Sequence, residues 1–143
     1  QIAFTIGHQL DPNMRRVEAG GLYLFEYGDE TPRHLIAEPD LGTPLFSPDG
    51  RRVAVAGGLG EGNALLIYEL ESAQITSLTE AKLEQIKQTA NPEERPFTFF
   101  SISPAVWLDN QRLLLKITFA FPDNPATIHR TTRIMKVVSG EIE

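Results

Sequence analysis

The sequence predicts an all-β fold made of repeated four-stranded antiparallel units, with one short helical insertion near residues 79–90. Three observations support this prediction: segments match one another at constant offsets, apolar residues alternate along several runs, and turn-forming residues separate those runs. The chain has 143 residues, of which 41% are hydrophobic. This is enough apolar material for one domain with a buried core.

Three pairs of segments align without gaps. PLFSPDGRRVAV (44–55) lies over PAVWLDNQRLLL (104–115), 60 residues later, with proline, aspartate, arginine and the apolar run in register. GLYLFEYGDETPRHL (21–35) lies over ALLIYELESAQITSL (64–78), 43 residues later, and YELESAQI (68–75) over MKVVSGEI (135–142), 67 residues later. Because the matches keep one order along the chain, we infer a single repeated unit.

The repeated unit contains four short strands, named a to d, which the middle copy places at 43–46, 52–56, 64–70 and 74–78. Alternation favours strands over helices: in LLLKITFAF (113–121), every second residue from Leu113 to Phe121 is large and apolar, and Lys116 and Thr118 lie between them. The turn-rich segments SPDG, YGDE and LESA separate the runs.

A repeat of about 43 residues with four antiparallel strands has the period and content of a β-propeller blade. The chain then divides into four parts: a partial blade with strands b to d (1–42), a complete blade (43–78), a helical and aromatic insertion (79–102), and a partial blade with strands a to c (103–143).

The blade pattern resembles a known family. The series P-x-F-S-P-D-G-R-x-V-A, followed by LLIYELES and a strand ending in SLT, is similar to the blades of TolB-type, WD-like β-propellers. The third copy departs from this pattern with WLDN. The resemblance implies a non-catalytic protein-binding scaffold of the bacterial envelope, and it favours an extracytoplasmic location.

The SPDG motif is expected to be a structural turn. We expect Pro48, Asp49 and Gly50 to bend the chain, with the Asp49 side chain capping a backbone N–H group two residues on. Asp109 and Asn110 occupy the aligned positions. Since asparagine is the residue that best replaces glycine in the left-handed conformation, we expect Asn110 to adopt it as Gly50 does.

Length variation is expected at one end of the blades. The gapless matches run through the a-to-b and c-to-d turns, whereas the b-to-c links (6–20, 56–63, 121–132) and the d-to-a links (36–42, 79–102) differ in length. In an up-and-down sheet these two kinds of link leave at the same edge. Variable loops on a fixed scaffold are frequent binding sites, so this end is the expected functional surface, although insertions also accumulate where nothing forbids them.

The longest link predicts a helix. Leu83, Ile86 and Ala90 have helical spacing, Ser77 and Glu80 resemble a capping box, and Asn91-Pro92 ends the pattern. A helix of about three turns must pack on something. We expect its apolar face to cover a blade edge; the alternative is a partner-binding surface, for which the possible contact residues are Leu83, Ile86, Phe97, Phe99 and Phe100.

Trp107 is expected in the core between blades.

Composition and motifs argue against several other functions. The net charge of −6 argues against nucleic acid as a partner, and the chain has no cysteine and no apolar run of the roughly 20 residues that cross a bilayer. His8, His34 and His129 occur singly, no G-x-S-x-G motif is present, and AGGLGEGN fits a hairpin loop better than a phosphate loop. We therefore expect no catalytic residues, metal or cofactor, while a calcium site assembled from separate blades stays open.

Three blades do not close a ring, because propellers need about four to eight. The remaining blades are expected either from another part of a longer chain, which the start at Gln1 favours, or from another subunit. The expected function is protein binding. The alternatives are a gating propeller segment of a prolyl-oligopeptidase-like hydrolase and a small-ligand or carbohydrate-binding propeller.

Overall fold

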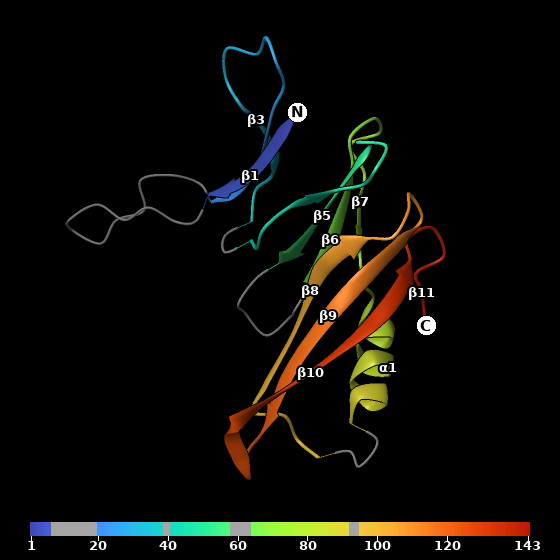
Figure 1. Ribbon diagram of the computed structural model, residues 1–143. Coiled ribbons are helices and arrows are strands. Elements are labelled where there is room, and N and C mark those ends of the chain that lie inside the picture. The colour runs from blue at the N-terminus through green and yellow to red at the C-terminus, as the bar shows by residue number, and fades with distance from the viewer. Residues whose placement is uncertain (7–19, 39–40, 58–63, 92–94) are drawn as a thin grey trace, which may run out of the picture.

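The computed structural model consists of three antiparallel sheets and one helix (Figure 1). It describes residues 1–6, 20–38, 41–57, 64–91 and 95–143. The predicted all-β class with one short helix is confirmed. No helix in these ranges has the length and apolar character needed to cross a membrane.

Each sheet is a meander in which successive strands are neighbours. Sheet 1 contains β1 (Ile2–Ile6), β2 (Gly21–Phe25) and β3 (Arg33–Ile36). Sheet 2 contains β4 (Leu45–Phe46), β5 (Arg52–Gly57), β6 (Ala64–Glu69) and β7 (Ile75–Ser77). Helix α1 (Glu80–Ala90) follows, and sheet 3 contains β8 (Phe99–Trp107), β9 (Arg112–Phe121), β10 (Asn124–Lys136) and β11 (Glu141–Ile142).

Strands c and d pair in the register that the 43- and 67-residue offsets predict. Tyr68 pairs with Ile75 in sheet 2, and the residues 67 positions later, Met135 and Ile142, pair in sheet 3. The same agreement links Ile67–Thr76 with Leu24–Arg33, 43 positions earlier. The last two strands of the three sheets therefore share one pairing pattern.

Sheet 2 is buried on both faces. One face, which carries Ala54, Leu65 and Ile67, belongs to the hydrophobic cluster shared with sheet 3. The other, which carries Val53 and Val55, belongs to the cluster shared with sheet 1. We call the face toward the next sheet of the chain the leading face and the face toward the previous sheet the trailing face.

Helix α1 covers the part of sheet 3 that sheet 2 does not reach (Figure 1). Ile86 is 1% exposed and packs with the inward residues of β9, while Leu83 and Ala90 pack at the edge of the same cluster. Burying one such side chain stabilises the folded state by about 1.5–3 kcal/mol. An isolated helix of this length is marginal in water because it has no such burial. The N-cap is Thr79, whose side chain accepts from the Lys82 N–H, and not Ser77 as expected; Asn91 is the C-cap.

Sheet 3 differs from its expected boundaries. Its first strand begins at Phe99, so the end of the expected insertion 79–102 is strand, and β11 adds a fourth strand to the expected partial blade 103–143. The expected long loop at 121–132 is instead a hairpin, because β9 and β10 continue to a turn at Pro122 and Asp123.

The c-to-d turn of sheet 2 has an alanine in a left-handed conformation, whereas the aligned turn of sheet 3 has a glycine at that position. Ala73 has φ +55°, and Gly140, at the aligned position 67 residues later, has φ +65°. A left-handed conformation is unfavourable for alanine because its Cβ approaches the following carbonyl oxygen.

Replacing Ala73 with glycine is expected to raise the free energy of unfolding by about 0.5–1 kcal/mol, since relief of strain exceeds the added chain entropy. Denaturant unfolding measures this change. The matched control is Gly140→Ala, which should lower stability through backbone strain alone because a Cβ there meets nothing within 4 Å. A less stable Ala73→Gly variant would contradict the assignment.

Candidate functional site

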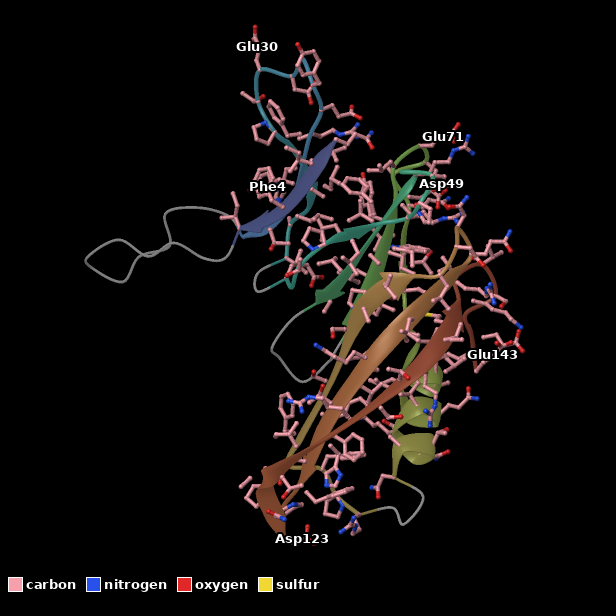
Figure 2. All side chains as sticks on the ribbon, viewed as in Figure 1. Phe4, Glu30, Asp49, Glu71, Asp123 and Glu143 are labelled. Carbon is pink, nitrogen blue, oxygen red and sulfur yellow. The ribbon has the colours of Figure 1, made fainter. Side chains whose placement is uncertain are left out.

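The molecule has two ends that differ in structure (Figure 2). The turn edge consists of the a-to-b and c-to-d turns, and Asp49 and Glu71 mark it on sheet 2. The loop end consists of the links that leave the opposite strand ends; among described residues it comprises the end of α1, residues 95–98 and the β9–β10 tip near Asp123.

The SPDG segment forms the expected turn. Gly50 has φ +70° and donates its N–H to the Ser47 carbonyl at 2.8 Å. The Asp49 carboxylate accepts from the Arg51 N–H at 3.1 Å, two residues on, and from the Ser47 hydroxyl at 2.6 Å. Asp109 repeats this role by accepting from the Gln111 N–H at 2.8 Å.

The expectation for Asn110 is wrong, because Asn110 does not have a positive φ. The turn of sheet 3 closes between Leu108 and Arg112, one residue shorter than the turn of sheet 2, which closes between Ser47 and Arg52. A register shift between Pro104 and Val106 compensates for the missing residue. The left-handed position of the longer turn therefore has no counterpart at Asn110.

Asn110 instead connects sheets 2 and 3. Its side-chain oxygen accepts from the Asp49 N–H at 3.0 Å, and its carbonyl accepts from the Arg52 guanidinium at 2.7 Å. A third bond lies nearby, where the Trp107 indole N–H donates to the Leu45 carbonyl at 3.1 Å. The turn motif thus holds neighbouring sheets together as well as bending the chain.

Hydrogen bonds lower the pKa of both turn aspartates. The Ser47 hydroxyl and then the Arg51 N–H hold the pKa of Asp49 below its usual value. For Asp109, the Gln111 N–H and then the Arg112 side chain lower the pKa. Each carboxylate is stabilised in its charged form by the turn that it caps.

The loop end contains an open groove of about 340 Å³ beside the C-terminal half of α1. Its lining residues are Glu84, Lys87, Gln88, Asn91, Arg95 and Phe97. The Lys87 ammonium is 2.7 Å from Glu84, and the Arg95 guanidinium is 3.2 Å from Asp123. The groove therefore presents both charge signs and two amides next to an aromatic ring.

Phe97, which lines the groove, belongs to an aromatic cluster. Phe97 contacts the rings of Phe100, Phe119 and Phe121, with centroids 5.1–5.6 Å apart. The Arg95 guanidinium carbon lies 3.8 Å from the Phe121 ring centroid, and His129 stacks on Phe119 at 5.2 Å. The cluster fixes the start of β8 against the β9–β10 hairpin.

The five possible partner-binding residues divide into two groups. Leu83, Ile86, Phe97 and Phe100 belong to the core or pack against it, as the expectation of a helix covering the blade required. Ile86 has almost no surface to offer a partner. Phe99 is 46% exposed, on the leading face of sheet 3. Trp107 is buried between sheets, as expected.

Several residues of the loop end were not predicted. Arg95 and Asp123 are 28 positions apart and meet only because the β9–β10 hairpin extends to the level of the helix end. The sequence pattern that could have located this hairpin is FPDNP (121–125), whose proline, aspartate and asparagine residues indicate a turn. It did not reveal that strands continue on both sides.

Within the described residues, no three His, Asp or Glu side chains gather as a metal site would require. His34 stacks on Tyr23 at 4.4 Å and His129 on Phe119. His8 and most of AGGLGEGN lie outside the described residues.

In comparisons with known proteins, no protein-family model matches this chain, and no curated protein shows significant similarity to it.

Replacing Asn110 with alanine is expected to lower the free energy of unfolding by about 0.5–1.5 kcal/mol, the usual net value of a hydrogen bond. Thermal or denaturant unfolding measures this. The adjacent exposed Gln111→Ala is the control and should change stability less. Equal effects for the two variants would argue that Asn110 does not hold the sheets together.

The turn aspartates predict a loss of stability in acid. Because their folded-state pKa values are lowered, their contribution is present above the unfolded value of about 3.9 and is lost as pH falls through the folded values. Urea midpoints between pH 6 and pH 2 should fall less steeply for a variant with both Asp49→Asn and Asp109→Asn than for the original chain. Parallel curves would contradict the role of these carboxylates.

Proposed function

We propose that the three sheets are blades of a β-propeller-type segment, and that the segment is a non-catalytic scaffold that binds a protein partner through its loop end. The observation that carries the binding proposal is the groove between the C-terminal half of α1 and residues 95–97, which is lined by side chains of both charge signs and by Phe97. The TolB-type resemblance of the SPDG segment supports the same class of function.

The blade interpretation is supported by how the sheets stack. The leading face of sheet 1 packs on the trailing face of sheet 2, and the leading face of sheet 2 packs on the trailing face of sheet 3. Repeated sheets that meet through the same two faces are what radial repetition of a blade requires.

The binding surface is assigned to the loop end because the two ends use their polar groups differently. At the turn edge, Asp49 and Arg52 of sheet 2 each donate a hydrogen bond to Asn110 of sheet 3. At the loop end, Glu84 and Asp123 are 52% and 68% exposed beside the groove. Arginine and aromatic side chains together are typical of protein-binding hot spots.

A small-molecule site fits this groove less well. Such sites are concave and mostly apolar, and they enclose most of the ligand. Here charged and amide side chains form most of the lining, and the groove is open to solvent. This chemistry fits a polar polypeptide segment better than an enclosed ligand.

The test compares two matched double variants in quantitative capture from an extract of the source cells. The loop-end variant carries Gln88→Asp and Ile128→Asp, and the turn-edge control carries Gln74→Asp and Ile75→Asp. All four residues are exposed, and Ile128 and Ile75 are 41% and 50% exposed. We expect the loop-end variant to lose about tenfold of the captured partner, a change worth about 1.4 kcal/mol of binding, and the control to retain it.

Capture that falls equally in both variants, or only in the turn-edge control, would contradict the assignment of the surface. Circular dichroism of each variant establishes that the fold is retained.

A further inference from the structure

The lining of the groove at the loop end has more positive than negative charge. Its described side chains include two cations, Lys87 and Arg95, and one carboxylate, Glu84; the others are two amides and the ring of Phe97. Asp123, at the β9–β10 tip, contacts Arg95 but is outside this lining (Figure 2). The 143 residues together have a net charge of −6, so the groove is opposite in sign to the chain as a whole.

Arg95 is held through both its main chain and its side chain. Its carbonyl accepts a hydrogen bond from the side-chain amide of Asn91, which is buried. Its guanidinium carbon lies 3.8 Å from the ring centroid of Phe121, a buried residue of the core. Stacking on a ring fixes the plane of a guanidinium, so less conformational entropy is lost when its N–H groups bind a ligand. Arg95 is therefore pre-organised to bind an anion.

The bond between Arg95 and Asp123 is weak. The two atoms are 3.2 Å apart, whereas charge-assisted hydrogen bonds are typically about 2.7–2.9 Å long. The side chains are 42% and 68% exposed, and exposed ion pairs contribute little to stability. By comparison, Arg112 and Asp109 at the turn edge approach to 2.7 Å. A carboxylate from a partner can therefore replace Asp123 with little loss of stability.

Arg95 is the stronger anion-binding group of the two cations. The Lys87 ammonium is 2.7 Å from Glu84, which also lines the groove and partly neutralises it. The carboxylate that contacts Arg95 comes instead from outside the lining. A guanidinium also has five N–H donors in one plane, which match the two oxygens of a carboxylate, whereas an ammonium acts as a point charge.

We infer that the polypeptide segment bound at the loop end is acidic, and that Arg95 binds a side-chain carboxylate of that segment in place of Asp123. This inference rests on the proposed function, because it names the partner of the same groove. A basic segment would bring its charges beside Lys87 and Arg95, where like charges repel. On the rest of the chain the net negative charge disfavours an acidic segment, which directs such a segment to this groove.

The experiment selects short peptides that bind the purified chain from a random library. The peptides are anchored through their C-termini, so that only side chains supply carboxylates. We expect the selected peptides to be enriched in aspartate and glutamate. Fluorescence anisotropy with one selected peptide, synthesised with an amidated C-terminus, then measures its dissociation constant for the original chain and for each variant.

Two variants of the ion pair should change this affinity in opposite directions. Arg95→Gln should weaken binding of the peptide by about tenfold, because a hydrogen bond between charged groups is lost. Asp123→Asn should strengthen it by about threefold, because the competing carboxylate is removed. Arg112→Gln is the matched control: it breaks the corresponding ion pair with Asp109 at the turn edge and should leave the affinity unchanged.

The opposite signs of the two effects keep the inference falsifiable if one variant fails to fold. A selection without enrichment in acidic residues, an affinity that Arg95→Gln leaves unchanged, or weaker binding by Asp123→Asn would each overturn it. If any of these occurs while the variant with Gln88→Asp and Ile128→Asp still loses the captured partner, only this inference fails and the proposed function stands. If that variant also retains the partner, both fail.

Discussion

The structure depends on the burial of sheet 2 on both of its faces. Val53, Ala54 and Val55 are consecutive in β5 and have no exposed surface, so neither face of this strand contacts water. An antiparallel sheet usually keeps one solvated face, whereas this one has the two buried faces of an inner layer. Sheet 2 therefore requires sheet 1 on one side and sheet 3 on the other.

The inter-sheet hydrogen bonds at the turn edge follow from this constraint. Apolar packing fixes the distance between two sheets but resists sliding only weakly, because it is not directional. Directional bonds from Asn110 and Trp107 to sheet 2 fix the relative position of sheets 2 and 3.

The pairing of strands c and d could be predicted from the sequence because gapless matches preserve side-chain alternation, whereas strand a of sheet 3 pairs with strand b one residue out of the register that the 60-residue offset predicts. A one-residue slip would move each buried side chain to the opposite face. The same matches misled the assignment of Asn110: the shorter turn after Trp107 is balanced by the register shift before Val106, so the residue count between strands is unchanged. A gapless alignment cannot detect two compensating changes.

The loop end was less predictable because its contacts join residues far apart in the sequence. The first half of β10, residues 124–130, has no buried side chain and therefore lacks the apolar alternation that identifies a strand. Phe99 and Phe100 are adjacent and face opposite sides of β8, one toward solvent and one toward the cluster with Phe97. Residue type alone does not show which of two adjacent phenylalanines faces the core and which faces solvent.

Strand β9 runs between the two ends of the molecule. This strand runs from Arg112, in the turn that contacts sheet 2, to Phe121, which lies under Arg95 at the groove. Its inward residues Leu113, Leu115 and Ile117 have no exposed surface, so the strand is held along its length by the core. The position of the groove is therefore set by the packing of sheet 2 on sheet 3, and a change at the turn edge that shifted this packing would also move the loop end.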